Sequence, residues 1–423
     1  MDINKLLRGV NCACGKMHTC DIEYVYIEEN ATQRLSEICG NYHNILLVAD
    51  ENTFAAGGEK TLSALTDKRI RKVIFSGAEI LVPNEIAIRE VQNNLDNIDL
   101  IVGIGSGVIQ DLCKYVSFYN KVPYMIVATA PSVDGYASNG AAMITDGMKV
   151  TYPAGLPKAI IADTSVLIHA PIEMLQAGYG DIIGKFSALN DWKLSHCING
   201  EYFCQYIYDL TYDQIQKTLS LADGILKRNE ESIKALMEAL VVIGVLMSFA
   251  GSSRPASGSE HHLSHFFEIT GIIDHTDYFP HGIDVAYSTV ITTKLREKLL
   301  ENTFPQEIYR LGKDGYTQKM DEIYKSSANG CMELQKKMGR YENNNAQMYL
   351  CKEHEIRRIL AEIPTSQEIE KMLSLVQLDM GKFYSLYGEE KINNAILYAK
   401  DLKDRYTVLW MYYDFLGGTA NVQ

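Results

Sequence analysis

The spacing of hydrophobic positions changes near the middle of the chain. Up to about residue 165, short apolar runs alternate with segments of helical spacing, which is typical of a parallel sheet wrapped by helices. The predicted strands are residues 44–49, 72–75, 99–103, 122–129 and 159–162. The predicted helices between them are residues 53–65, 83–95 and 108–119, with Pro83 at a helix start. This half is expected to be a nucleotide-binding domain.

After Pro171 the strand pattern disappears. Apolar residues then recur at helical spacing, for example in residues 215–226, 230–250 and 366–378. The expected architecture is an α/β domain with a parallel sheet over residues 1–168, followed by an all-α domain over residues 169–423 that binds metal and substrate.

Composition and charge narrow the class of protein. The formal charge of −13 repels phosphate backbones and anionic lipid surfaces, so a nucleic-acid partner is not expected. The most apolar run, residues 239–250, is shorter than the roughly 18 residues that a membrane span needs, and it predicts a buried core helix. An odd set of nine cysteines and the lack of a secretory signal favour reduced thiols and a cytoplasmic protein.

A glycine-rich motif follows the predicted strand at residues 99–103. Gly103, Gly105 and Gly107 would let the backbone approach a pyrophosphate, which the free N–H groups of the following helix would stabilise. The G-x-G-x-G spacing differs from the G-x-G-x-x-G of dinucleotide-binding folds, so a tight turn is the alternative. Asp50, at the end of the first predicted strand, either receives ribose hydroxyls or caps the next helix.

A polar loop, residues 129–138, follows another predicted strand on the same expected edge of the sheet. Its hydroxyls can contact phosphate or ribose. Asp134 and Gly135 within it belong either to this site or to a simple turn, and the turn is favoured when the loop is considered alone.

Histidines cluster in the second half: five of the ten lie between residues 261 and 281. Ser257 and Glu260 have the spacing of a capping box, so a helix is predicted to start there with His261 and His265 on one face. With Asp181, two histidines form a mixed oxygen and nitrogen set that suits a divalent metal and leaves positions open for water or substrate. Solvated or core histidines are the alternative.

Two questions about possible metal ligands stay open at this point. Periodicity does not decide whether His261 or His262 faces the metal, although sharing a face with His265 favours His261. Near the N-terminus, Cys12, Cys14 and His18 resemble a small metal knuckle without a fourth ligand at clear spacing; Cys20 is the nearest candidate, and an ordinary turn is the favoured interpretation.

Five segments taken together resemble the sn-glycerol-1-phosphate dehydrogenases. This family belongs to the superfamily that also holds the iron-containing alcohol dehydrogenases, glycerol dehydrogenase and dehydroquinate synthase. The resemblance runs from about residue 10 to 290, in the order and spacing of the family. The segments are GSGVIQDLCK, TAPSVDGYAS, AGYGDIIGK, SRPASGSEHHLSH and a closing HG.

The resemblance implies a set of residues for each role. The metal ligands would be Asp181, His261 and His281, and the residues in contact with substrate would be Asp134, Asp181 and His265. NAD or NADP would be held, with Asp50 at the adenosine end, by Gly107, Val108, Ile109, Gln110, Asp111, Thr129, Ala130, Pro131, Ser132 and Ser138. Gln110 stands where family members usually carry Asn, while Asp111 and Lys114 are in place.

The implied reaction interconverts dihydroxyacetone phosphate and sn-glycerol 1-phosphate. A divalent metal, nickel, zinc or iron, would act as a Lewis acid on the C2 oxygen, with His265 relaying the proton and Asp134 beside it. The substrate phosphate needs a cation; Arg254 is the first candidate and Lys149 the second. The alternative for Arg254 is a surface or helix-entry residue.

Other functions remain open on sequence grounds. A dehydrogenase for glycerol or another small alcohol would share the cofactor and metal residues. A carbon–oxygen lyase of the dehydroquinate synthase type would need several more basic contacts. A nucleotide-sensing protein without activity is disfavoured by the intact Asp/His/His set. A homodimer is the expectation that the family carries.

Overall fold

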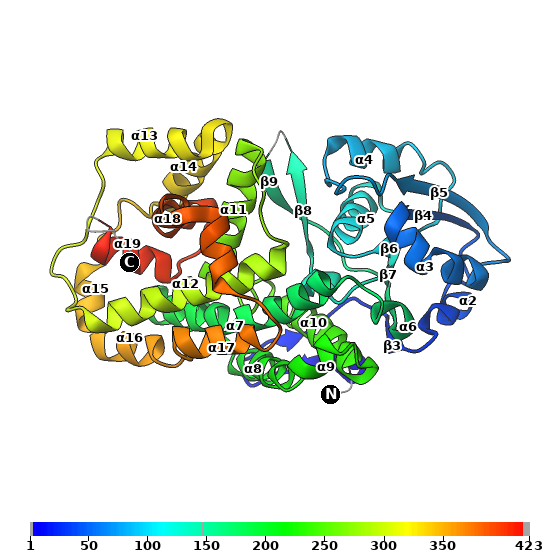
Figure 1. Cartoon of the computed structure of the whole chain (residues 1–423), viewed down its shortest axis with the longest axis horizontal. Helices are drawn as coiled ribbons and strands as arrows, with labels where there is room; N and C mark the ends of the chain where they lie inside the picture. Colours follow the sequence, from blue (N-terminus) through cyan, green and yellow to red (C-terminus); the bar gives the residue numbers. More distant parts are fainter. Residues whose placement is uncertain (1–2, 146–147, 418–423) are drawn as a thin grey trace. The chain divides into compact units, whose positions relative to one another are not determined.

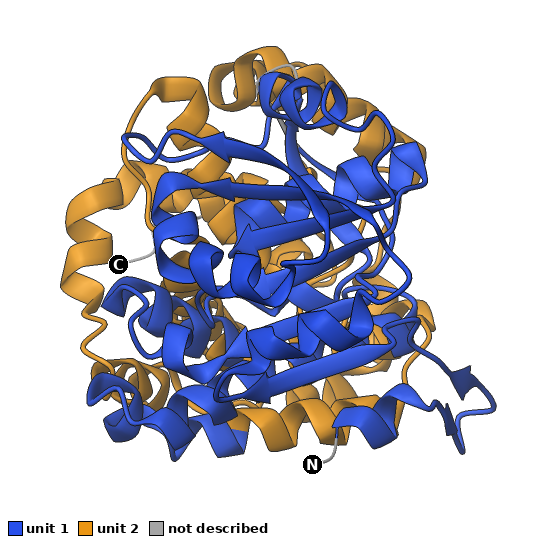
Figure 2. Cartoon of the chain, turned by 90° about the vertical axis from the view of Figure 1, so that its right-hand side faces the viewer, with its two compact units in different colours: residues 1–182, 216–253 blue, residues 183–215, 254–423 orange. Residues whose placement is uncertain are grey.

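The computed structural model describes residues 3–145 and 148–417. The chain divides into two compact units, residues 1–182 with 216–253 and residues 183–215 with 254–423 (Figure 2). Two of the three borders fall inside continuous helices, α7 (Ile172–Asn199) and α8 (Gln205–Leu219), and the third follows Ser253. The predicted border after residue 168 differs from this division, because α10 (Glu230–Ala250) packs on η2 (Asp134–Ala137) and on the sheet strand β3 (Tyr24–Glu28).

The first unit is built on a six-stranded parallel sheet in the order β3-β10-β7-β6-β4-β5 (Figure 1). All five predicted strands are present, and β3 at the edge is an additional one. The other bounds are β4 (Asn44–Asp50), β5 (Arg69–Phe75), β6 (Leu100–Gly105), β7 (Tyr124–Ala128) and β10 (Ala159–Asp163). The predicted α/β architecture with a parallel sheet is confirmed.

The strand order reverses at β4 and β6, which lie side by side. From β4 the chain continues to β5 on one side, whereas β6, β7 and β10 follow one another on the other side. Open α/β sheets bind their ligands outside the carboxyl ends of the strands at this point of reversal. Here those ends are Asp50 and the glycine motif that begins with Gly103.

Helices cover both faces of the sheet. Alternate residues of β6, such as Val102 and Ile104, face the core that includes residues of α3 (Glu51–Ala64), while Gly103 faces α5 (Gly107–Asn120). The predicted helix at residues 83–95 is α4 (Glu85–Gln92). It begins after Pro83, because the Asn84 side chain accepts the N–H groups of Ile86 and Ala87 and forms the N-cap.

Two antiparallel hairpins add to this unit, and the hydrophobic pattern did not predict either. One is β1 (Val10–Asn11) with β2 (Met17–His18), and the other is β8 (Gly140–Thr145) with β9 (Met148–Pro153). The helix α10 is the one described helix long and apolar enough to cross a membrane; 78% of its apolar window is buried inside the protein, as in a core helix.

The second unit has no strand among its described residues, as predicted for an all-α region. Its helices include α11 (Ser259–Asp274), α12 (His281–Glu301), α13 (Lys313–Tyr324), α14 (Ala328–Met338), α15 (Ala346–Cys351), α16 (Glu353–Leu360), α17 (Ser366–Ser374), α18 (Met380–Tyr398) and α19 (Val408–Leu416). Residues 215–226 were predicted as one helix. In the structure α8 ends at Leu219 and a separate helix, α9 (Ala222–Leu226), follows, because the backbone turns at Ser220.

A buried carboxylate organises the helices that bear the histidines. Asp191 on α7 pairs with Arg296 of α12 at 2.8 Å, and both side chains are at most 1% exposed. Its oxygens also accept the backbone N–H groups of Ser259 (2.6 Å) and Val408 (2.8 Å). Asp191 therefore fixes the first residues of α11 and α19 to α7. Removing one partner of such a buried pair costs about 3–5 kcal/mol.

Candidate active site

The glycine motif lies at the carboxyl end of β6 and opens α5. A Cβ on Gly103 would stand 2.9 Å from the Sγ of Cys113, and one on Gly105 would stand 2.6 Å from the Cβ of Ile109. These two glycines let α5 pack closely on the sheet. A Cβ on Gly107 would meet nothing nearer than 3.5 Å, and the Ser106 N-cap makes no side-chain capping bond. The Ser106 side chain therefore does not occupy the first N–H groups of α5, which are the groups that would bind an anion.

Lys114 holds several of the predicted cofactor residues together. Its buried ammonium lies 3.1 Å from Asp111 Oδ1 and donates to Ser138 Oγ (3.2 Å) and to the carbonyl of Gly135 (3.0 Å). The second Asp111 oxygen accepts the N–H of Ala142. Lys114 thus holds the polar loop to α5, and the contacts of Asp111 and Ser138 with a cofactor stay a prediction.

Gln110, which replaces the usual Asn, is fully buried. Its Nε2 donates to the Tyr124 hydroxyl and to the Tyr136 carbonyl, each at 3.0 Å. The buried Oε1 of Gln110 has no hydrogen-bond partner among the described residues, so only the amide nitrogen is satisfied within the first unit.

Asp50 caps α3, which is one of the two interpretations left open by the sequence. Its Oδ1 accepts the Thr53 N–H at 2.9 Å, and Thr53 Oγ1 accepts the Asp50 N–H at 3.1 Å. The capped carboxylate still lies at the end of β4, beside the point where the strand order reverses. A contact between Asp50 and ribose stays a prediction.

Two glycines hold the polar loop after β7 against long helices. A Cβ on Gly178 of α7 would lie 1.9 Å from the Pro131 carbonyl oxygen, and one on Gly244 of α10 would lie 2.8 Å from the Asp134 carbonyl oxygen. The Asp134 N–H also donates to Asp181 Oδ2 at 2.9 Å. The loop predicted to bind cofactor and substrate is therefore hydrogen-bonded to the predicted metal ligand Asp181.

The three predicted metal ligands converge. Asp181, His261 and His281 each offer an atom within 4.8 Å of the others. Asp181 and His261 are buried, whereas His281, the first residue of α12, is partly exposed. One carboxylate and two imidazoles fit a divalent borderline metal, and such a set leaves coordination positions open for water or substrate.

Glu260 orients the ring of His261. Its Oε1 lies 2.7 Å from His261 Nδ1 and accepts the Gly258 N–H at 2.8 Å. A carboxylate on Nδ1 keeps a proton there and leaves Nε2 as the ligand atom, as around metal-bound histidines. Burial acts to raise the pKa of Glu260, but the hydrogen bonds and charge of His261 outweigh it, so the pKa lies below its usual value.

The capping box predicted for Ser257 and Glu260 is wrong. The helix α11 begins at Ser259 with Gly258 as its N-cap, and that cap makes no side-chain bond. The reason is that the Glu260 carboxylate bonds to the Gly258 N–H and to His261. A role for Glu260 in orienting a ligand was therefore missed; the signal for it was an acid directly before the histidine.

The remaining histidines differ sharply from one another. The ring of His265 lies 6.2 Å from that of His261 and 5.4 Å from that of His281, measured between centroids. His262 is fully buried, and this burial lowers its pKa well below the usual value, so it is neutral at physiological pH. The geometry thus favours His261 over His262 as the ligand.

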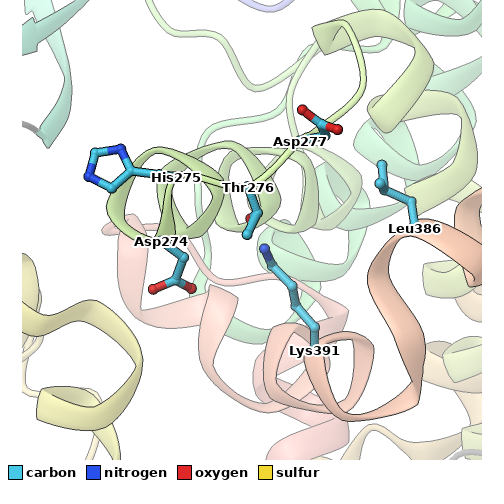
Figure 3. A pocket seen from close by; sticks show the side chains of 6 residues that line it. All are labelled: Asp274, His275, Thr276, Asp277, Leu386 and Lys391. Atoms are coloured by element: carbon cyan, nitrogen blue, oxygen red, sulfur yellow. The ribbon is translucent and has the colours of Figure 1, made fainter.

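His275 ends α11 with a left-handed φ of 53° and lies at a surface pocket (Figure 3). The lining residues are Asp274, His275, Thr276, Asp277, Leu386 and Lys391. These six include none of the predicted site residues, and Asp274 is paired with Lys325. We assign no catalytic role to this pocket.

Arg254 is 3% exposed and lies in a network of hydrogen bonds. Its Nε donates to Glu201 Oε1 at 2.6 Å, a second nitrogen binds the other Glu201 oxygen, and further bonds reach the Tyr406 carbonyl and Ser195 Oγ. The Glu201 carboxylate thus binds two guanidinium nitrogens of Arg254, which is how a phosphate would be bound. The geometry favours the alternative role at the helix entry, and phosphate binding stays a prediction. The side chain of Lys149 lies outside the described residues.

The parallel sheet with its glycine turn and the Asp/His/His set are the features expected of a metal- and NAD(P)-dependent dehydrogenase of the iron-containing alcohol dehydrogenase class. The family model described as iron-containing alcohol dehydrogenase matches residues 26–171. Solved structures agree on the fold. The glycerol dehydrogenase of Schizosaccharomyces pombe has a TM-score of 0.53 at 19% identity, over 86% of this chain and 91% of that one. The maleylacetate reductase of Rhizobium sp. strain MTP-10005 has a TM-score of 0.60 at 12% identity, over 95% and 98%.

Curated relatives narrow the class to one family. The glycerol-1-phosphate dehydrogenase (NAD(P)+) of Halalkalibacterium halodurans is 35% identical over 293 residues, which cover 67% of this chain and 73% of the relative. The enzyme of the same name from Geobacillus stearothermophilus is 33% identical over 66% and 71%, and that of Bacillus licheniformis is 29% identical over 94% and 90%. The chain belongs to the NAD(P)-dependent glycerol-1-phosphate dehydrogenases. It is accordingly a metal-dependent oxidoreductase that uses NAD(P).

Proposed function

We propose that this chain interconverts dihydroxyacetone phosphate and sn-glycerol 1-phosphate, with a hydride moving between C2 of the substrate and C4 of the nicotinamide. The observation that carries the proposal is the convergence of Asp181, His261 and His281 in a member of this family. A divalent metal held by these residues supplies Lewis acidity at the C2 oxygen.

The side chains around these ligands have distinct roles in the proposal. Glu260 keeps the proton of His261 on Nδ1 and so directs Nε2 toward the ligand set. Asp134, whose N–H binds Asp181, contacts the substrate. His265, one helical turn from His261, relays the hydroxyl proton, since histidine exchanges protons near neutral pH.

NAD or NADP is expected at the carboxyl ends of β4 and β6. The N-terminus of α5, which the Ser106 side chain does not cap, and the space around Gly107 support a pyrophosphate there. The proposed contacts, with Asp50 at the adenosine end, are Gly107, Val108, Ile109, Gln110, Asp111, Thr129, Ala130, Pro131, Ser132 and Ser138. Nickel, zinc and iron all suit the Asp/His/His set, so metal availability and geometry decide among them.

The substrate phosphate needs a cation. Arg254 and Lys149 are the candidates from the sequence, and Arg405 is a further one from the structure. Arg405 donates to the Ser257 carbonyl at 3.1 Å, just before α11. Burial and the nearby charge of Arg254 lower its pKa to about 10, so it remains a cation at neutral pH.

A dehydrogenase for glycerol or another small alcohol is the second candidate function. The observation that favours it is the Arg254–Glu201 pair, because Glu201 binds the guanidinium nitrogens that were expected to bind the substrate phosphate. Such an enzyme would use the same metal and cofactor residues.

An absorbance assay separates these functions. Protein stripped of metal and reloaded with nickel, zinc or iron is mixed with NADH or NADPH and with dihydroxyacetone phosphate or dihydroxyacetone. We expect oxidation of the cofactor with the phosphorylated ketone. Oxidation with dihydroxyacetone alone would establish the second candidate, and no net oxidation with either ketone would contradict both and point to a lyase or a sensor.

The family resemblance also carries the proposals of a homodimer and a cytoplasmic location. All nine cysteines lie in the described residues and none forms a disulfide, which suits a reducing compartment. Light scattering during size-exclusion chromatography tests the dimer, and a monomeric mass would contradict it.

A further inference from the structure

A second cluster of metal-ligating residues lies outside the site described above. Cys12, Cys14, His18 and Cys204 offer ligand atoms that all lie within 4.8 Å of one another. The first three form the N-terminal run whose spacing favoured an ordinary turn, because no fourth ligand stood at clear spacing. The structure supplies that ligand as Cys204, directly before α8, in place of the nearby Cys20.

We propose that these four residues bind a zinc ion in a closed Cys3His site that is separate from the catalytic metal. Zinc prefers four tetrahedral sulfur and nitrogen ligands in structural sites. This proposal does not depend on the substrate of the enzyme.

The hairpin geometry prepares the first two ligands. The Cys12 N–H donates to the Lys16 carbonyl at 3.1 Å, and the Gly15 N–H donates to the Cys12 carbonyl at 3.0 Å. Gly15 has a φ of +85°, which glycine adopts without strain, and a Cβ there would meet no atom within 4 Å. The tight turn is therefore set by the backbone conformation of Gly15 and brings both thiols to one end of the hairpin.

The distance between Cys14 and His18 fits a shared zinc ion. Cys14 Sγ lies 3.4 Å from His18 Nε2. Zinc–sulfur and zinc–nitrogen bonds of about 2.3 and 2.0–2.1 Å in a tetrahedron place the two ligand atoms about 3.5 Å apart. The observed spacing is close to that value.

A backbone carbonyl fixes the tautomer of His18. His18 Nδ1 lies 3.0 Å from the Phe249 carbonyl oxygen, which can only accept, so the proton is on Nδ1 and Nε2 presents its lone pair to the thiols. The ring also stacks on Phe249, with 5.3 Å between centroids. His18 is thus oriented as metal-bound histidines are.

Ligand number distinguishes this cluster from the proposed catalytic set. His18 and Cys204 are each 1% exposed, and Cys12 and Cys14 are partly buried. Four protein ligands complete a tetrahedron and leave no position for a substrate, whereas three leave one. We therefore assign a structural role to the ion.

Cobalt spectroscopy tests the assignment on the full-length protein. Thiolate ligands give bound cobalt an intense near-ultraviolet charge-transfer band, and the Asp181, His261 and His281 set contains no sulfur. We expect this band in the cobalt-loaded wild type and in His281→Ala, and its loss in Cys12→Ser and Cys204→Ser. Cys351→Ser, at an exposed cysteine outside the cluster, is the matched control and keeps the band. Absence of the band in the wild type, or its survival in Cys204→Ser, would overturn the proposal.

A second measurement needs no variant. Native protein with zinc is alkylated before and after a chelator, and the modified cysteines are identified by mass spectrometry. We expect Cys12 and Cys14 to react only after chelation, while Cys351 reacts in both states. Equal labelling of Cys12 and Cys14 in the two states would contradict a zinc site.

Discussion

The two proposed ligand clusters of this chain orient histidine in the same way but surround it with different donors. His261 belongs to a set with one carboxylate and two imidazoles, and its Nδ1 is held by the side chain of Glu260. His18 belongs to a set of three thiols and one imidazole, and its Nδ1 is held by the backbone at Phe249. Three hard or borderline ligands leave a metal reactive, whereas four ligands that include three thiolates enclose it. In these two proposals, donor type and number distinguish the catalytic site from the structural one.

The largest effect is expected from His281→Ala. Loss of a ligand removes the Lewis acid from the substrate oxygen, a contribution of several kcal/mol, so kcat with dihydroxyacetone phosphate should fall by about 1,000-fold or more. Steady-state kinetics with excess metal measure it. The thiolate–cobalt band should persist in the same variant; its loss would mean that the two clusters are not independent.

Cys204→Ser should act on stability. A ligand present at 100 times its dissociation constant stabilises a fold by about 2.7 kcal/mol, so the free energy of unfolding should fall by about that amount or more. Urea denaturation of zinc-loaded protein measures the change. Chelator should lower the wild-type value and leave that of the variant unchanged, and an equal response in the two proteins would argue against a structural ion.

Arg254→Ala and Arg405→Ala locate the substrate phosphate relative to the catalytic set. Arg405→Ala should raise the KM for dihydroxyacetone phosphate by about 10- to 150-fold, which corresponds to the 1.5–3 kcal/mol of a charged hydrogen bond. Arg254→Ala should instead lower the free energy of unfolding by about 1–3 kcal/mol, because it leaves Glu201 without its buried partner. The reverse pattern, a raised KM and native stability for Arg254→Ala, would restore Arg254 as the phosphate ligand.

The smallest effect is expected from Glu260→Gln. Loss of the carboxylate that holds a metal-bound histidine typically weakens metal affinity by about 10- to 100-fold. Competition with a metal chelator measures the affinity, and the neighbouring Glu268→Gln serves as a control on the same helix. An unchanged affinity would mean that the ligand atom of His261 is not selected by Glu260.

The local hydrophobic pattern was sufficient to predict the strands of the sheet and the helices next to it. Residues 44–49 and 99–103 alternate with amphipathic segments, so their periodicity alone predicted β4 and β6. The break between α8 and α9 was missed because apolar residues continue through it. The Asp/His/His set was assigned through the order of family motifs, since spacing alone left core histidines as an alternative.

Contacts between distant residues account for most of what the sequence did not predict. Nothing in the sequence connects Cys204 with Cys12, or Arg254 with Glu201, because such pairs depend on how the helices pack. Glu260 has the spacing of a cap, but its carboxylate bonds to the adjacent His261. Periodicity and spacing describe a single element, so the partners of a side chain on another element escaped them.

The space around Gly178 and around Gly107 predicts which substitutions the active-site region tolerates. A methyl group at position 178 would occupy the same space as the Pro131 carbonyl, whereas one at position 107 would meet only ordinary van der Waals contacts. In a saturation library selected for activity, glycine alone should survive at position 178, while alanine at position 107 should remain with a higher KM for the dinucleotide. Mutation, in evolution or by design, can therefore change the affinity for the cofactor far more easily than the position of the loop that carries Asp134.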